Sequence, residues 1–329
     1  MKAIVRLVSV AFAVALGAAS TFAQAPADAD YPSRPITMIV PLAAGSAADI
    51  VARLVGTKMS ADLGRQIVVE NAPGAAGLVG IERATKAAPD GYTIVGVSDS
   101  VLTMVPQLNP NAKFDPHKDL TPITQLAIID WVLVSNPSFP AKTVQEFLAL
   151  AKAKPGEINF SSGGNASPQH VAMEAFKART GINLTHVPYR GATAALTDVV
   201  AGVVPVMFTA ISVAHPFLVD GKLHALATAG RKRSELLPDV PTVSEAGVGG
   251  FEFETWMSLM APANLPKAIS DKLHASALKA VNDPEIRAKL LAVGLVPLGN
   301  KPEEFRANLA RDYAKMGEII RAAGMKAEQ

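Results

Sequence analysis

The sequence predicts an α/β protein with two units, each built from a parallel sheet and crossover helices. The first indication is a strand, turn and helix near the N-terminus: the apolar run 36–40 ends at Pro41, and helical apolar spacing begins near Ala47. Strand-like and helix-like segments then alternate along the chain, which is typical of βαβ units. Two long extended stretches, 123–134 and 251–259, can carry the chain from one sheet to the other and back.

The start of the chain has the three-part pattern of a cleavable secretory signal. Lys2 and Arg6 precede the apolar run 7–16, and small residues follow as far as Ala23. That run is shorter than the roughly 20 residues that span a bilayer, so a retained membrane anchor is the weaker alternative. We expect cleavage after Ala23 rather than Ala25, because a proline would follow the second cut, and we expect the mature protein in the periplasm.

Composition excludes several classes of partner and site. The chain has 31 Lys and Arg against 29 Asp and Glu, and removal of Lys2 and Arg6 with the signal leaves 31 − 2 = 29 of each sign. A neutral mature protein has no overall attraction for nucleic acid or anionic lipid. The absence of cysteine rules out disulfides, thiol catalysis, a lipid-modified cysteine and cysteine metal sites. The histidines show no metal-ligand spacing, and we expect no cofactor and no metal.

Each unit has its own run of strands and helices. Ser167 fits a helix N-cap, and Pro168 fits the first helical position after it. The expected strands cover residues 36–40, 67–70, 92–97, 158–160, 184–187, 204–208, 223–228 and 295–298. The expected helices begin near 47 and cover residues 78–87, 144–153, 169–180, 193–201, 212–219, 270–281, 284–293 and 303–323.

Turns of glycine and small polar residues follow several of these strands. Gly45 and Ser46 separate the first strand from its helix, and the turn 161–168 follows a strand of the second unit. In a parallel sheet such turns lie at the carboxyl ends of the strands, where unpaired backbone N–H groups and the helix dipole favour an anion. We therefore expect a carboxylate-binding mouth between the two units.

Nine short segments resemble the extracytoplasmic solute receptors of the tripartite tricarboxylate transporter family, the Bug receptors. They keep the order and spacing of that family from about residue 31 to the C-terminus. The segments are YPSRPI at 31–36, ADIVAR at 48–53, VENAPGAAG at 69–77, PDGYT at 89–93, SSGGN at 161–165, VPYRG at 187–191, ALTD at 195–198, GKLHALA at 221–227 and LLPDVPTV at 236–243.

The resemblance implies a type II periplasmic-binding-protein fold, in which two α/β domains joined by two crossing segments hold the ligand cleft between them. Such a receptor captures a small carboxylate-containing solute by domain closure and delivers it to the membrane permease subunits of a tripartite tricarboxylate transporter. It is a monomer, not an enzyme. The limits implied for this chain are 1–23 for the signal peptide, 24–127 and 253–329 for domain 1, and 128–252 for domain 2.

Three turns and one strand end carry the ligand-binding residues that the resemblance implies. The chain departs from the family at Ala48, where a hydroxyl is frequent, at Pro205, where Asp is usual, and after Phe208, where an acidic or amide residue is common. The expected residues are Ala44, Gly45, Ser46 and Asp49 in the first turn, Ser161, Ser162, Gly163 and His170 in the second, Tyr189 and Thr193 in the third, and Thr209.

Several of these polar residues also have a structural interpretation. Asp49 can stabilise the first turn of its own helix. His170 can be a structural histidine, and Ser161 and Ser162 can be turn formers. Arg190 suits a ligand carboxylate and a salt bridge within the protein equally well.

Two other classes of function stay open. A periplasmic sensor that presents its ligand-bound form to a signalling partner needs the same closing domains. A serine hydrolase built on Ser162 and His170 is the less favoured alternative, because the sequence has no nucleophile elbow, Walker loop, zinc-protease motif or dinucleotide fingerprint.

Overall fold

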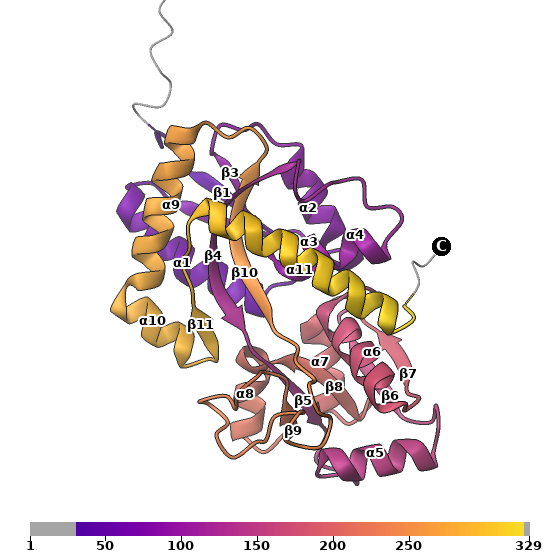
Figure 1. The fold of residues 1–329 in the computed structure, drawn as a ribbon. Helices are drawn as coiled ribbons and strands as arrows, with labels where there is room; N and C mark the ends of the chain where they lie inside the picture. The colour runs from indigo at the N-terminus through magenta and orange to yellow at the C-terminus, as the bar shows by residue number, and fades with distance from the viewer. Residues whose placement is uncertain (1–30, 326–329) are drawn as a thin grey trace, which may run out of the picture. The chain divides into compact units, whose positions relative to one another are not determined.

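Two sheets, joined by two crossing segments, organise the computed structural model, which describes residues 31–325 (Figure 1). The predicted signal peptide, residues 1–23, lies outside the described residues. No helix within 31–325 is both long enough and apolar enough to cross a membrane.

The first sheet has six strands in the order β11-β4-β10-β3-β1-β2. Strands β1, β2 and β3 are parallel, whereas β10 runs antiparallel to β3 and β4. We call this sheet and its helices the first lobe. Its strands are β1 (Ile36–Val40), β2 (Ile67–Asn71), β3 (Thr93–Ser98), β4 (Leu120–Ile129), β10 (Thr255–Pro262) and β11 (Leu295–Pro297). Its helices are α1 (Ala47–Leu63), the 3₁₀ turn η1 (Ala75–Gly77), α2 (Leu78–Thr85), α3 (Asp99–Thr103), α4 (Val105–Leu108), α9 (Lys267–Asn282), α10 (Pro284–Leu291) and α11 (Pro302–Ala322).

The second sheet has five strands in the order β7-β6-β8-β5-β9. Strands β6, β7 and β8 are parallel, and β5 runs antiparallel to β8 and β9. This sheet and its helices form the second lobe. Its strands are β5 (Trp131–Ser135), β6 (Asn159–Ser162), β7 (Thr185–Pro188), β8 (Val206–Ala210) and β9 (His224–Thr228). Its helices are α5 (Val144–Ala153), α6 (Pro168–Thr180), α7 (Ala192–Val200) and α8 (Ile211–Val219).

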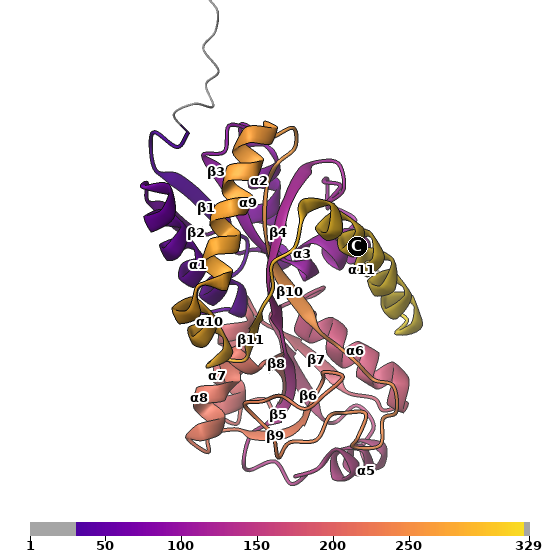
Figure 2. The same cartoon turned by 60° about the vertical axis from the view of Figure 1, so that its left-hand side comes forward.

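Helices cover both faces of the first sheet. Successive side chains of a strand point to opposite faces, and β10 shows this directly. The side chain of Met257 lies over Gly96 of β3, on the face that Ala52 of α1 covers. Its neighbour Trp256 points to the other face and packs edge-to-face on Phe305 of α11. Figure 2 accordingly shows α9, which packs on α1, and α11 on the two sides of β4 and β10. Such two-sided cover explains why the central strands β3, β4 and β10 are almost wholly buried.

The two crossing segments meet where the chain passes between the lobes. The predicted extended run 123–134 is confirmed: it becomes β4 and β5, in different sheets, with Asp130 between them. The indole Nε1 of Trp131 donates to Thr255 Oγ1 at 2.8 Å, which ties the first crossing to the second. Burial, together with the nearby carboxylate of Glu254, raises the pKa of Asp130 to about 6.

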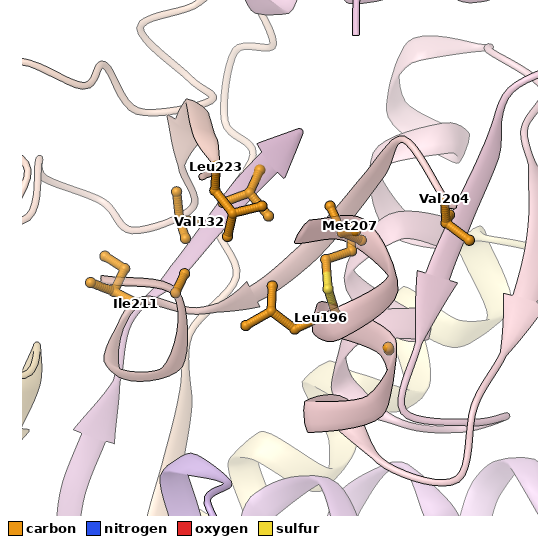
Figure 3. Close-up of a cluster of buried hydrophobic side chains, with 10 residues drawn as sticks. Val132, Leu196, Val204, Met207, Ile211 and Leu223 are labelled. Carbon is orange, nitrogen blue, oxygen red and sulfur yellow. The ribbon is translucent and has the colours of Figure 1, made fainter. Parts of the chain in front are cut away.

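A cluster of buried aliphatic side chains sets the positions of α7 and α8 on the second sheet (Figure 3). Leu196 of α7 and Ile211 of α8 pack with Val132 of β5 and Met207 of β8. Because β8 ends and α7 begins at the edge that faces the first lobe, this cluster fixes the positions of the end of β8 and the start of α7. The end of β8 carries Thr209, and the start of α7 follows Gly191.

Most of the predicted elements are confirmed, with differences at their ends. Helix α9 begins at Lys267, directly after Pro266, which takes the N-cap position. Strand β8 continues to Ala210, two residues beyond the prediction. The stretch after β3, for which the sequence predicts no helix, forms α3 and α4. The sheet memberships agree with two domains, but their limits stay a prediction.

Candidate functional site

Three helix N-termini, from both lobes, border a small cavity of about 60 Å³, here called the inner cavity. The starts of α1, α6 and α7 form its rim, and Trp131, Thr209 and Thr255 also line it. A second cavity of about 860 Å³, the outer cavity, shares Leu42, Ala43, Ala76, Gly163 and Gly191 with it. The two cavities therefore adjoin, with the smaller one at the junction of the crossing segments.

Backbone N–H groups at these helix starts lack acceptors. The first N–H groups of a helix have no intrahelical partner, and they carry the positive end of the helix dipole. On α1, Ser46 caps the N–H of Asp49 with its hydroxyl; on α6, Ser167 does the same for His170. The remaining N–H groups without an acceptor among residues 31–325 include those of Ala47 and Ala48 on α1, Gln169 on α6, and Ala192 and Thr193 on α7.

The buried carboxylate of Asp49 fixes the turn between β1 and α1 through hydrogen bonds within the first lobe. Its carboxylate, 3% exposed, accepts hydrogen bonds from Gly45 N at 2.9 Å, Arg53 Nε at 3.0 Å and Asn71 Nδ2 at 2.9 Å. Burial raises the pKa of Asp49, but these hydrogen bonds outweigh it and leave the pKa below its ordinary value. Asp49 is thus an ionised anchor for a turn in which Gly45 adopts φ +76°.

Replacing Asp49 by Asn should lower the free energy of unfolding by about 2–3 kcal/mol, because hydrogen bonds to a buried charge are lost and an amide N–H₂ then faces other donors. Urea denaturation measures this loss. The matched control is Asp271→Asn, which breaks an exposed pair with Lys267 of the same i,i+4 spacing and should change stability by less than about 0.5 kcal/mol. Equal effects of the two variants would contradict the anchoring role.

In the second turn the two serine hydroxyls bond within their own lobe. Ser161 Oγ donates to Ala195 O at 3.3 Å, and Ser162 Oγ lies 2.6 Å from His186 Nε2. Gly163 lines both cavities, and a Cβ there would lie only 2.9 Å from Ala192 N. A glycine is therefore required for this turn to approach the start of α7.

His170 belongs to a stack of rings. Its imidazole lies 3.9 Å from that of His186, with 7° between the planes, and His186 in turn stacks on Phe160. His170 Nδ1 accepts the N–H of Ala166 at 3.3 Å. Burial, His186 and Lys177 lower the pKa of His170 to about 3, and burial and Lys177 lower that of His186 to about 4. Both rings are therefore neutral at pH 7 and bring no positive charge to the outer cavity, which His170 lines.

The third turn makes contact between the lobes. Thr193 Oγ1 donates to Ala44 O at 3.4 Å, and Gly191 approaches so near that an added Cβ would lie 3.3 Å from the Cβ of Ala43. Tyr189 donates its hydroxyl to Asp198 at 2.5 Å; this bond and burial raise the pKa of Tyr189 to about 12. Tyr189 lines the outer cavity as an uncharged phenol.

The predicted ligand-binding residues fall into two groups. Ser46, Gly163, His170, Tyr189 and Thr209 line one or both cavities. The others, which hold the turns or join the lobes, line neither: Ala44, Gly45, Asp49, Ser161, Ser162 and Thr193. Ligand contact stays a prediction for all of them.

Sequence reasoning missed several cavity residues. The sequence predicts Trp131 only as part of a crossing segment and predicts no site role for Thr255 or Gln169, yet all three line the inner cavity. Gln169 follows the predicted N-cap Ser167 by two positions, so its free N–H could have been anticipated. Asp99, whose carboxylate would suit an ammonium group of an amino-acid solute, is buried at the start of α3 and lines neither cavity. Within residues 31–325 no cluster of three potential metal ligands occurs.

Comparisons with known proteins identify the family and the fold of the chain. The family model described as "Tripartite tricarboxylate transporter family receptor" matches residues 51–325. BugT of Bordetella pertussis is 32% identical over 304 residues, which cover 92% of this chain and 93% of BugT. The solved periplasmic binding protein BugD superposes with a TM-score of 0.87 at 30% identity and covers 91% of this chain and 100% of its own. MatC from Rhodopseudomonas palustris, solved with bound malate, has a TM-score of 0.84 at 30% identity and covers 88% of this chain and 100% of its own.

The predicted resemblance and the two-domain periplasmic-binding-protein fold are therefore confirmed, and the chain belongs to the tripartite tricarboxylate transporter receptor family.

Proposed function

We propose that this protein captures a small carboxylate-containing solute in the periplasm and delivers it to the permease subunits of a tripartite tricarboxylate transporter. The observation that carries the proposal is the convergence of unpaired N–H groups from three helix starts on one cavity. No acidic side chain lines that cavity within the described part of the chain, so nothing there repels an anion. The similar protein MatC, with its bound malate, supports a carboxylate as the ligand.

Domain closure is part of the proposal because the backbone N–H donors come from helices of both lobes. Helix α1 belongs to the first lobe, and α6 and α7 belong to the second. A carboxylate at the inner cavity makes its full set of charge-assisted hydrogen bonds only when the lobes are together, and contacts such as Thr193–Ala44 then also form. A ligand that binds the closed arrangement better than the open one shifts the population towards it.

The structure favours binding over catalysis at this site. Ser162 is hydrogen-bonded to His186, not to the His170 of the hydrolase hypothesis, and its side chain is fully buried outside both cavities. A nucleophile must reach its substrate, and this hydroxyl does not border the space where a solute can lie.

A sensor would use the same closing lobes, and the choice of membrane partner separates it from a transport receptor.

The test is a thermal-shift and calorimetry screen of the mature protein, unfolded and refolded to remove co-purified ligand. Short and long monocarboxylates and dicarboxylates are compared with the matching amides. We expect at least one acid, and not its amide, to raise the melting temperature by several degrees at saturation, because a ligand that binds only the folded state stabilises it. An equal response to acid and amide would refute the carboxylate site.

A further inference from the structure

We infer that the inner cavity selects a short monocarboxylate whose other end bears an uncharged polar group, such as a hydroxyl or carbonyl, and that Thr209 receives this group. The inference rests on the proposed function and names the substrate class of the same site. It depends on the cavity's size, on the charge of its lining and on one unpaired hydroxyl.

The volume of the inner cavity limits how many ligand atoms this cavity can enclose. A water-sized group occupies roughly 10–15 Å³ of such volume. A cavity of about 60 Å³ therefore holds about four to six non-hydrogen atoms. A three-carbon hydroxy acid has a size in this range, whereas a six-carbon diacid exceeds it and would extend into the outer cavity.

The lining provides no countercharge for a second ionised group. Its polar side chains are serine, threonine and glutamine, with no Asp, Glu, Lys, Arg or His among the described lining residues. Arg190 lines only the outer cavity, and Asp99 lines neither. One carboxylate is compensated by the helix N–H groups, but a second carboxylate or an ammonium group buried in so small a space would be left unpaired at a large cost.

Thr209 provides a neutral hydrogen-bonding position. Its side chain is 1% exposed, and its Oγ1 has no hydrogen-bond partner among the described residues. Two other hydroxyls of the lining each have a partner within the protein: Thr255 Oγ1 accepts from Trp131 Nε1, and Ser98 Oγ lies 2.6 Å from Ser100 Oγ. A buried hydroxyl without a partner is costly, so a ligand that supplies one gains affinity over an analogue that does not.

The experiment measures the affinities of four probes: lactate, propanoate, lactamide and adipate. Calorimetry is done on the refolded mature wild type and on Thr209→Val, which keeps the shape and removes the hydroxyl. We expect the wild type to bind lactate at least tenfold more tightly than propanoate. In Thr209→Val this preference should fall below about twofold, mainly through weaker lactate binding, while propanoate affinity is unchanged.

Two controls separate ligand recognition from stability. Thr209→Ser retains the hydroxyl and should retain the preference. Thr228→Val removes another buried unpaired hydroxyl, which lies on β9 and does not line the inner cavity, and it should leave the preference unchanged. Melting temperatures without ligand verify that each variant folds.

Three results would each refute a different statement about the site. Tighter binding of adipate than of lactate would refute the selected ligand class and leave the carboxylate site intact. An unchanged lactate preference in Thr209→Val would refute the role of Thr209. Binding of lactamide as tight as that of lactate would refute the proposed function itself.

Discussion

Replacement of Ala47 by proline is expected to raise the dissociation constant of the bound carboxylate by about 10- to 100-fold without loss of stability. Proline removes one N–H, and a hydrogen bond to a charged group is worth about 1.5–3 kcal/mol. Ala47 is the first residue of α1, and its N–H has no acceptor within the described residues. No helical hydrogen bond is therefore lost.

The backbone is already suited to this substitution. Proline is favoured at the first helical position, and the residue before it must be extended. Ser46 has φ −70° and ψ 159°, almost the same as Ser167, with φ −69° and ψ 156°, which precedes Pro168 at the start of α6. The variant thus copies onto α1 a geometry that the protein already uses on α6.

Calorimetry and urea denaturation of Ala47→Pro give affinity and stability separately. The control is Ala47→Val, which adds bulk of similar size but keeps the N–H. A proline effect at least several times larger than the valine effect assigns the loss to the donor. Equal losses in both variants would mean that the start of α1 contributes shape rather than a hydrogen bond.

Helix starts of this kind could be predicted from the sequence because their chemistry is local. The glycine and serine before Ala47 indicate a turn and a cap, and α1 begins where they place it. The same holds for Ser167 and Pro168 on α6. The anion-binding edge follows from these helix starts and from the rule that turns in parallel sheets share one edge.

Contacts between distant strands could not be predicted in this way. Trp131 and Thr255 are 124 positions apart, and only the packing of the two crossing segments brings them together. His186 reaches Ser162 because β6 and β7 pair with Phe160 opposite His186. Register depends on which residues the whole fold buries, so no short stretch of sequence encodes it.

The His170–His186 pair has a consequence for acid stability. Both rings must stay neutral: His170 Nδ1 accepts a hydrogen bond from Ala166, and a proton on either ring would place a charge in a buried stack. Glu174 lies 3.9 Å from His170 but is paired with Lys177 at 2.7 Å, so it offers little compensation. The stack and its hydrogen bonds hold the turn between β6 and α6, which carries Gly163.

The direction of the pH effect follows from the lowered pKa values. In the unfolded chain a histidine has a pKa of about 6.5, whereas in the folded protein these pKa values are about 3 and about 4. Between these limits the unfolded state binds more protons, so the free energy of unfolding falls as the pH falls. Asp130 acts in the opposite direction below about pH 6, because its pKa is raised in the folded state.

The pair is therefore expected to cost about 2–4 kcal/mol of stability when the pH is lowered from 7.5 to 5, at up to about 1.4 kcal/mol per pH unit for each ring. The double variant His170→Asn and His186→Gln keeps an acceptor or donor near Nδ1 and Nε2 but cannot gain a proton in this range. Urea denaturation at several pH values should show a much flatter profile for the double variant than for the wild type. Asp130→Asn, which removes the opposing group, should make the wild-type loss steeper. A double variant with the pH profile of the wild type would show that the stacked histidines do not control acid stability.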